Sequence, residues 1–559
     1  MIILGISALD KESTVAILRD GRCTFALSEE RLTREKQQGG FPARSLEKAL
    51  QFEGLTPAQI DAVAYPFFEG GRESRLILGC LANSATRLPS EVFSRPGQAL
   101  RSFYYQGRWS GKAILDHRRY HRELVAGLAP LGLLANLRRV EHHEAHAASA
   151  YFTSGFDRAL MLTVDAYGSG LTTTVTLGES GRLRRLHSVR FPHSMGMFYA
   201  QITKALGFVP DRHEGKILGL AAYGKPGDLG REVLGRFSPR DGFVSSCLFD
   251  RRFPAQVARS YPREQAAAAW QETLEKVVVD YLKPFLREHR ADCVALAGGV
   301  VANVKLNQRI AEMEGVSRVF VYPAMNDSGT GAGAAMVLQA EAGGMQSRRL
   351  SDVFLGPGFS AAEVDQALAG RGLKTRKMAD PGEEIGELLA GGKTVARCAG
   401  RMEYGPRALG NRSILFQASD PRANVWLNEK LKRTEFMPFA PATLAEEAHR
   451  CYLNLEVAAD AARFMTITYD CTDYMKQASP AAVHVDGTAR PQLVDKETNP
   501  TFHAILTAYL RRTGIPSVLN TSFNIHEEPI VCSPSDAVQT FLAGDLDALA
   551  LEDLLVTRS

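Results

Sequence analysis

The sequence contains no Cys-x-x-Cys pair. Its eight cysteines are scattered over 559 residues, so neither a zinc ribbon nor a disulfide scaffold is expected. Isolated cysteines suit the reducing cytosol, and we therefore expect a cytoplasmic protein.

Long apolar runs and basic blocks are also missing. No segment reaches the length that spans a bilayer, and the apolar residues 1–7 lack the basic flank and cleavage site of a signal peptide, so they predict a first strand. The formal net charge is only +4, without a basic stripe. We therefore expect neither a membrane nor a nucleic acid as partner.

The chain is long enough for several domains, because one hydrophobic core rarely supports 559 residues. Two stretches share the order strand, loop, strand and turn, at residues 2–22 and 160–182. This repeat predicts an α/β fold with a duplicated domain and a cleft between its halves, as in sugar kinases and actin.

Two histidines and two strand ends predict a metal site. His142 and His146 are four residues apart and so lie on one face of a helix. Asp165 ends an apolar strand, and Asp327 ends another strand before a glycine-rich helix. Two imidazoles with a carboxylate suit iron, manganese or zinc. There are two structural alternatives. The His-rich helix could only cap a core, and the glycine-rich start of the helix after Asp327 could only allow close packing.

A glycine pair and a boundary lie further along the chain. Gly298 and Gly299 follow a buried strand and precede a helix, where a ligand can approach the backbone and anions are favoured. The run 342–345 breaks regular structure, and we predict domains of residues 1–349 and 350–559. The second domain alternates helices and strands and is another α/β unit.

Residues 400–413 of the second domain combine three arginines with glycines and hydroxyls. Guanidinium groups bind oxyanions through two hydrogen bonds, so this run predicts a site for polyphosphate or carbamoyl phosphate. A solvated Arg-rich loop is the alternative.

Two further polar runs, 484–490 and 519–524, adjoin apolar strands. Buried polar groups need partners, so we expect hydrogen bonds to a ligand or within the runs. Lys432, at a helix end, is either another anion contact or a surface lysine.

In this order, the runs resemble the carbamoyltransferases of natural-product tailoring and nodulation-factor decoration. The resemblance spans nearly the whole chain. Its motifs are residues 28–36 with 39–42, 142–147, 192–196, 214–221, 297–299 with Asn303, Asp327, 400–413, 484–490 and 520–524.

The resemblance implies a reaction in two steps. The C-terminal domain looks like a YrdC-like unit, which would make carbamoyl-adenylate from carbamoyl phosphate and ATP with Mg²⁺. The N-terminal domain looks like the Kae1-type member of the actin/sugar-kinase superfamily. It would hold the adenylate and a divalent metal, often Fe²⁺, and pass the carbamoyl group to a hydroxyl of a small-molecule natural product.

The same resemblance assigns residues. The metal ligands would be His142, His146, Asp165 and Asp327. Carbamoyl phosphate or nucleotide would be bound by Lys36, Gly298, Gly299, Asn303, Arg401, Arg407, Arg412, Lys432, Arg490, Asn520, Ser522 and Asn524. Catalysis would involve Lys11, Glu12 and Asp165.

Two positions depart from the family pattern. Lys11 and Glu12 stand where the family usually has a His-Asp pair, and Ala166 replaces a glycine after Asp165. A lysine normally stays protonated near neutral pH and would need a depressed pKa to act as a general base. Transfer to an amine or another nucleophile, and a nucleotide-binding homologue without transfer, therefore stay open.

The acceptor itself cannot be named from the sequence. We expect variable loops, such as the insertion at 67–120, to line its pocket, and we allow for a homodimer.

Overall fold

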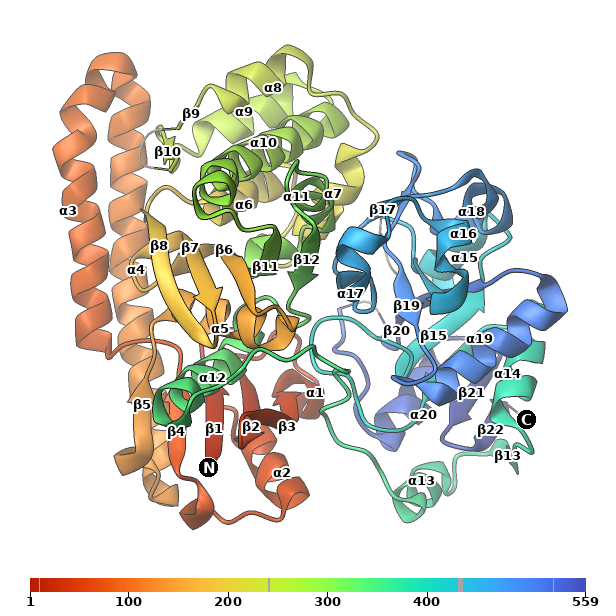
Figure 1. Ribbon diagram of the computed structural model, residues 1–559. Helices are drawn as coiled ribbons and strands as arrows, with labels where there is room; N and C mark the ends of the chain where they lie inside the picture. Colours follow the sequence, from red (N-terminus) through yellow and green to blue (C-terminus); the bar gives the residue numbers. More distant parts are fainter. Residues whose placement is uncertain (10, 240–241, 431–435, 526, 559) are drawn as a thin grey trace. The chain divides into compact units, whose positions relative to one another are not determined.

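The computed structural model describes residues 1–9, 11–239, 242–430, 436–525 and 527–558, which form two compact units (Figure 1). Unit 1 comprises Met1–Thr24 and Gly39–Leu350, and unit 2 comprises Phe25–Gln38 and Ser351–Ser559. A short N-terminal segment therefore belongs to the unit that the C-terminal half of the chain builds.

Unit 1 contains two five-stranded sheets with the same strand order. The first, ordered β3-β2-β1-β4-β5, consists of β1 (Ile2–Ser7), β2 (Thr14–Arg19), β3 (Arg22–Ser28, which runs on into unit 2), β4 (Ala62–Tyr65) and β5 (Leu137–Arg139). The second, ordered β8-β7-β6-β11-β12, consists of β6 (Arg158–Gly168), β7 (Leu171–Glu179), β8 (Arg182–Arg190), β11 (Cys293–Ala297) and β12 (Arg318–Val321).

The two sheets also agree in strand direction and in turn chemistry. β1 pairs antiparallel with β2 and parallel with β4, as β6 does with β7 and β11. The β2–β3 turn has positive φ at Asp20 and Gly21, and the β7–β8 turn has it at Ser180 and Gly181, which is the two-residue hairpin turn that matches strand twist. The predicted duplication is confirmed.

The last strand of each sheet leads into a helix, and these two helices pack together. They are α5 (His142–Ser154) and α12 (Thr330–Gly343). A Cβ at Gly333 would lie 2.0 Å from the Ala145 carbonyl oxygen, and one at Gly331 would lie 3.0 Å from the Ile6 backbone. Close packing therefore explains the glycines of α12.

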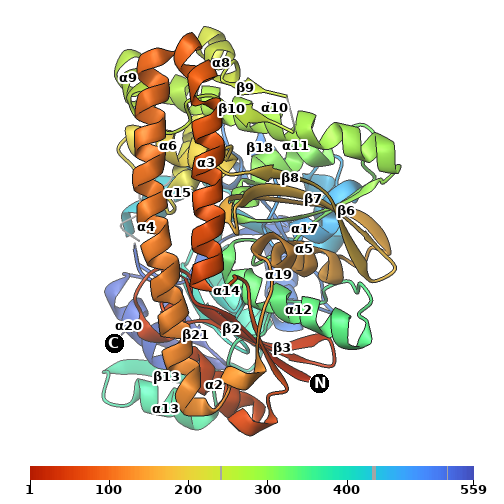
Figure 2. The same ribbon diagram turned by 90° about the vertical axis from the view of Figure 1, so that its left-hand side faces the viewer.

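The two halves differ in what connects their strands. Between β4 and β5 lie α3 (Gly70–Ser94) and α4 (Pro96–Leu128), which run side by side as a long hairpin (Figure 2). Between β11 and β12 lie only a 3₁₀ turn and α11 (Val304–Ala311). The second half has its own addition after β8, formed by α6 (Met195–Ala205), α7 (Glu214–Ala221), α8 (Gly227–Leu234), β9 (Phe237–Ser238), β10 (Val244–Ser245), α9 (Arg252–Ser260) and α10 (Arg263–His289). After β3 the first half has α2 (Ala43–Glu53), and α1 (Glu30–Thr33) lies before it in the segment that belongs to unit 2.

Unit 2 is built on one mixed eight-stranded sheet. Its order is β13 (Leu373–Lys377), β22 (Leu554–Arg558), β21 (Ala548–Leu551), β14 (Val395–Cys398), β15 (Arg412–Gln417), β20 (Ser517–Ser522), β16 (Ala440–Leu444) and β19 (Gln492–Val494). Shorter elements are α15 (Ala423–Lys430), α16 (Ala448–Cys451), α17 (Ala459–Ala462), β17 (Tyr469–Asp470), α18 (Asp473–Ala478) and β18 (Thr488–Ala489).

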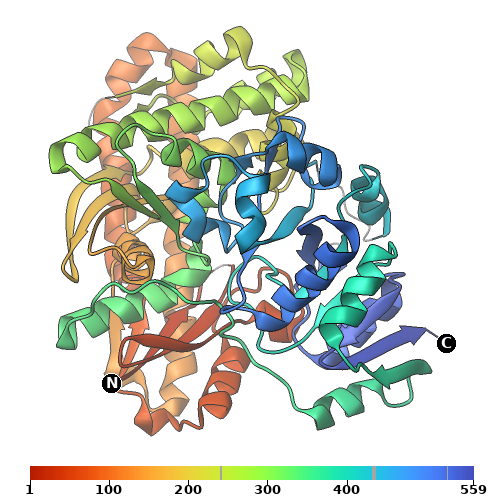
Figure 3. The same cartoon turned by 45° about the vertical axis from the view of Figure 1, so that its right-hand side comes forward.

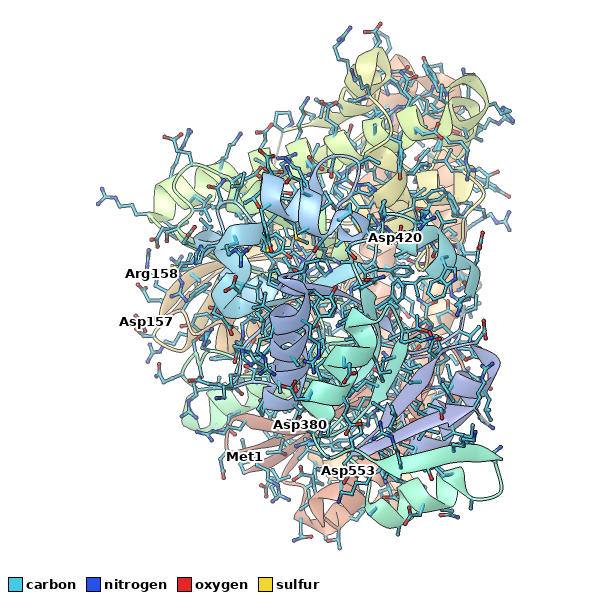
Figure 4. All side chains as sticks on the ribbon, turned by 90° about the vertical axis from the view of Figure 1, so that its right-hand side faces the viewer. Met1, Asp157, Arg158, Asp380, Asp420 and Asp553 are labelled. Carbon is cyan, nitrogen blue, oxygen red and sulfur yellow. The ribbon has the colours of Figure 1, made fainter. Side chains whose placement is uncertain are left out.

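Helices cover both faces of this sheet (Figure 3). One core joins α14 (Pro381–Ala390) and α19 (Pro500–Thr513), and the other joins α13 (Ala361–Leu368) and α20 (Pro534–Ala543). Val395 and Ala396, neighbours on β14, belong to opposite cores, as the alternation of a strand requires. At the surface, Asp380 caps α14 and Asp553 pairs with Lys377 (Figure 4).

The predicted α/β class, with a duplicated domain and a second α/β unit built mainly from the C-terminal part of the chain, is confirmed. Within the described ranges, no helix has the length and apolar character needed to cross a membrane.

Candidate functional site

The four predicted metal ligands come together in unit 1. Glu141 caps α5 by accepting the backbone N–H groups of His143 and Glu144, so that His142 and His146 lie on consecutive turns. Asp165 extends from β6, and Asp327 lies in the short turn before α12. One ligand atom of each of the four residues lies within 4.8 Å of the others.

The distances suit one ion. The Nε2 atom of His146 lies 3.1 Å from the His142 Nε2 atom and 3.1 Å from the Asp165 Oδ2 atom. The Oδ1 atom of Asp327 lies 3.5 Å from both Nε2 atoms. Donor atoms about 2.1 Å from one ion lie about 3.0–3.4 Å apart in octahedral or tetrahedral geometry. The donor set therefore fits a divalent metal.

The carboxylates make this cluster attract positive charge. Burial would lower the pKa of His146, but hydrogen bonds and charges from Asp165 and Asp327 outweigh it and raise the pKa to about 9. Burial would raise the pKa of Asp165, yet the two histidines hold it well below its ordinary value. The two carboxylates therefore favour a positive charge between the four side chains.

The two histidines present their Nε2 atoms, and not their Nδ1 atoms, to the carboxylates. The Nδ1 atoms of His142 and His146 are buried and have no hydrogen-bond partner in the described part of the chain. His143, between them, points elsewhere, to the Thr163 hydroxyl at 2.7 Å. A helix that merely capped a core would not direct both Nε2 atoms at two carboxylates.

Motif 192–196 supports Asp165. The Ser194 hydroxyl donates to the carbonyl oxygens of Asp165 and Ala166 and also caps α6. A Cβ at Gly196 would lie 2.8 Å from the Ala166 backbone. Contacts of Ser194 and Gly196 therefore hold the backbone at Asp165 and Ala166 in place.

The Gly298–Gly299 pair also packs against this strand. Gly298 has φ +100°, and a Cβ there would lie 2.3 Å from the Val164 carbonyl oxygen. One at Gly299 would lie 3.2 Å from the Asp165 Oδ1 atom. Close approach to β6 explains both glycines, and their contact with a nucleotide stays a prediction.

The first loop places its two unusual residues differently. Glu12 has a left-handed backbone (φ +59°) and its carboxylate accepts a 2.6 Å hydrogen bond from Asn326, the neighbour of Asp327. Lys11 instead lies 3.2 Å from Asp211. Of the pair, Glu12 is the one tied to the metal ligands.

Asn303 is used within the protein. Its side chain caps α11 and exchanges two amide hydrogen bonds with Gln271 of α10. This network explains the asparagine without a ligand, and nucleotide binding by Asn303 stays a prediction.

The hairpin adds a carboxylate that the sequence did not single out. Glu73 on α3 is fully buried and accepts hydrogen bonds from Ser169 (2.8 Å) and Tyr167 (3.3 Å), just after Asp165. Burial raises the pKa of Glu73. Phe67, before α3, has its ring centroid 4.5 Å from that of His142. No motif marks these residues, because they lie in the insertion expected to be variable.

In unit 2, Glu403 organises the arginine-rich run. Its Oε1 atom accepts the backbone N–H groups of Leu409, Asn411 and Arg412. Arg412 itself is fully buried and donates to four backbone carbonyls, those of Ala399, Gly400, Asn411 and Cys532. These bonds suit a structural role for Arg412.

Two other predicted anion-binding residues, Arg401 and Arg407, belong to this run, and Asn520 contacts it. Arg401 donates to the Leu355 and Gly356 carbonyls, and Arg407, which is half-buried, lies in the same loop. Asn520 on β20 donates to Ala408 and Gln492, while its buried Oδ1 atom has no hydrogen-bond partner among described residues.

Four further predicted residues are less closely placed. Ser522 ends β20, opposite Ser413. Asn524 donates to the carbonyls of Ile525 and Glu528. Arg490 is half-buried and follows β18. Lys432 lies outside the described residues.

The N-terminal segment 25–38 completes these loops within unit 2. Ala26 donates to the Leu355 carbonyl, and Arg31 donates to that of Gly405. Arg34 donates to the carbonyls of Pro529 and Ile530, at 2.8 and 2.7 Å. Lys36 lies 3.9 Å from Glu30 in the same segment. The segment thus contacts the arginine-rich run at Gly405 and the residues that follow Asn524, at Pro529 and Ile530.

Comparison with known proteins decides the family. Residues 2–336 match the model of the carbamoyltransferase N-terminus, and residues 386–558 match that of the carbamoyltransferase C-terminus. The chain belongs to the carbamoyltransferase family. The predicted resemblance is confirmed, and this carbamoyltransferase is a transferase that moves a carbamoyl group from a donor to an acceptor.

Its relatives include nodulation proteins. The chain is 31% identical to nodulation protein NolNO of Sinorhizobium fredii, over 98% of this chain and 79% of the relative. It is 34% identical to nodulation protein NolO of Bradyrhizobium diazoefficiens, over 75% of this chain and 79% of the relative. An uncharacterized Synechocystis protein is 30% identical over 100% of this chain and 97% of its own length.

Proposed function

We propose that this carbamoyltransferase activates carbamoyl phosphate with ATP in unit 2 and transfers the carbamoyl group to a hydroxyl of a small-molecule natural product in unit 1. The observation that carries the proposal is the convergence of His142, His146, Asp165 and Asp327 on one point.

The activation step uses the polar loops of unit 2. Water first cleaves carbamoyl phosphate to carbamate and inorganic phosphate, and a carbamate oxygen then attacks the α-phosphorus of ATP, which would bind together with Mg²⁺. The bond to pyrophosphate breaks, and carbamoyl-adenylate forms. Arg407 and Arg490 stabilise the charge that develops on the phosphate oxygens. Glu403 and Arg412 hold the loop in shape by their buried hydrogen bonds.

The transfer step uses the residues around the histidine cluster. Glu12, oriented by Asn326, takes the proton of the acceptor hydroxyl as its oxygen attacks the carbamoyl carbon and AMP leaves. A divalent metal bound by His142, His146, Asp165 and Asp327, with Fe²⁺ as our assignment, would polarise the carbonyl and neutralise the leaving phosphate.

Two variants separate the steps. Purified protein is incubated with ATP and carbamoyl phosphate, and pyrophosphate release is measured. Arg490→Leu should abolish release, whereas His146→Ala should keep it and lose only the transfer to an acceptor. Normal pyrophosphate release by the first variant would refute its assignment.

Product analysis separates the remaining alternatives. Mass spectrometry of the products formed with hydroxylated and with aminated metabolites would distinguish O-carbamoylation from transfer to an amine. The second alternative is considered because Lys11 stands where the family usually has a histidine. Absence of pyrophosphate release with metal supplied would favour a nucleotide-binding homologue without transfer. The cytoplasmic location, the homodimer and the absence of a nucleic-acid partner stay predictions, checked by fractionation, light scattering and gel shift.

A further inference from the structure

The α3–α4 hairpin is an addition to the repeated unit. Residues 66–136 connect β4 to β5, whereas residues 298–317 make the equivalent connection between β11 and β12 with one short helix. The second half of unit 1 therefore completes its equivalent sheet without a helical hairpin. The outer surface of α3 and α4 is not needed for the fold.

This hairpin concentrates positive charge. Residues 70–128 contain ten Lys or Arg and four Asp or Glu, a net charge of +6, while the whole chain carries +4. Eight of the ten basic residues are exposed, and none of the four acidic residues is more than partly exposed. Charge separated in this way favours an anionic partner.

A groove of about 610 Å³ lies at the base of the hairpin, where α3 begins and α4 approaches its end. Arg118, Arg119 and Arg122 line it, together with Leu115 and the Gly70–Gly71 pair. Arg118 and Arg122 form no ion pair with any residue that the structure describes. The volume is typical of small-molecule sites.

One acidic residue, Asp116, also borders the groove. Its carboxylate is already paired with Lys112 and with Arg119, at 3.4 Å from the latter. The charge that remains for a ligand is therefore positive and comes from Arg118 and Arg122.

The two glycines have separate roles. A Cβ at Gly70 would lie 3.1 Å from the Arg118 Cα atom, so this glycine lets α3 approach α4. A Cβ at Gly71 would meet no described atom within 4 Å. The groove is consequently open down to the backbone at Gly71.

We propose that this groove binds a small molecule carrying two or more phosphate groups. Guanidinium groups on successive turns of one helix can each bind a phosphate through two hydrogen bonds. None of the groove residues belongs to the metal cluster or to the loops assigned to carbamoyl phosphate and ATP, so the site is a separate one.

The groove is linked to the metal cluster by direct contacts. His121, on its wall, lies 2.7 Å from the Arg139 guanidinium. Arg139 donates to the Phe67 and Phe68 carbonyls, and the Phe67 ring packs against His142. A bound phosphate compound would restrain the segment that positions His142.

The test measures binding of inorganic tripolyphosphate to the full chain by calorimetry. It is done in the Arg490→Leu background, which weakens the phosphate site assigned to unit 2. Arg118→Ala with Arg122→Ala should weaken binding about tenfold or more, because two charge-assisted contacts are lost. The matched control, Arg75→Ala with Arg108→Ala, removes the same charge from the hairpin outside the groove and should change binding by about twofold or less.

A second pair guards against misfolding. Gly71→Asp places a carboxylate in the groove at a helix start that favours it, and should weaken binding as strongly as the double arginine variant. Gly71→Ala should leave binding unchanged.

Three results would overturn the proposal. Equal losses in both double variants would mean general charge attraction, and no loss in either would place the phosphate elsewhere. Tighter groove-dependent binding to phosphatidylglycerol vesicles or to RNA than to tripolyphosphate would replace the small molecule by a macromolecular partner.

Discussion

Replacing Glu403 by alanine should release the loop that carries Arg407. The carboxylate is 4% exposed, and its Oε1 atom accepts N–H groups from Leu409, Asn411 and Arg412 at 2.8, 2.8 and 3.1 Å. A hydrogen bond to a charged group contributes about 1.5–3 kcal/mol, and bonds to one shared atom are not additive. We therefore expect Glu403→Ala to destabilise unit 2 by about 3–5 kcal/mol.

Glu403→Gln keeps an acceptor oxygen but removes the charge. Its expected loss is smaller, about 1–2 kcal/mol, because neutral hydrogen bonds are roughly half as strong. Pyrophosphate release should fall in the same order, with the alanine variant lowest.

Hydrogen exchange gives the most local measurement. Peptides that cover residues 404–413 should lose protection in Glu403→Ala and keep most of it in Glu403→Gln. Glu497→Ala, which changes an exposed glutamate of the same unit, is the control. Wild-type protection of these peptides in Glu403→Ala would refute the role assigned to the carboxylate.

Three further predictions concern other parts of the molecule. Burial raises the pKa of Glu73 above 4.5, so the wild type loses stability as pH rises from about 4.5 through the raised value. Glu73→Gln has no such loss, so denaturant titrations should show its free energy of unfolding rising relative to that of the wild type as pH increases. A difference between the two proteins that stays constant with pH would contradict this. Arg34→Ala removes two bonds to backbone carbonyls and should cost about 1.5–4 kcal/mol and slow pyrophosphate release, whereas unchanged release would show that segment 25–38 is not needed for activation. Asp165→Asn should lower bound metal, measured by elemental analysis, to about a tenth or less of wild type, while full occupancy would remove Asp165 from the ligand set.

Local periodicity was sufficient to predict the histidine cluster. A spacing of four residues on a helix placed His142 and His146 together, and the ends of two apolar strands placed Asp165 and Asp327 beside them. Each prediction depended on one regular element, either a helix or the end of an apolar strand.

Composition was less informative about which arginine of the run 400–413 can bind a ligand, because burial decides this. Arg401, Arg407 and Arg412 look alike in the sequence, yet Arg412 begins β15 and is fully buried among carbonyls. Which arginine faces a ligand depends on the position of that strand in the sheet, and the run itself contains no signal for it.

Contacts between distant segments could not be predicted at all. Glu73 reaches the loop after Asp165 from an inserted helix, and Arg34 reaches Ile530 across almost the whole chain. Neither residue lies in a periodic pattern that distinguishes it from a surface charge.

The division of labour between the two units is tested most directly by following radiolabelled carbamoyl phosphate with ATP and a carbamoyl acceptor. His146→Ala should accumulate carbamoyl-adenylate without carbamoylated product, and Arg490→Leu should form neither. Product formation by His146→Ala at the wild-type rate would contradict a transfer step that depends on the histidine cluster.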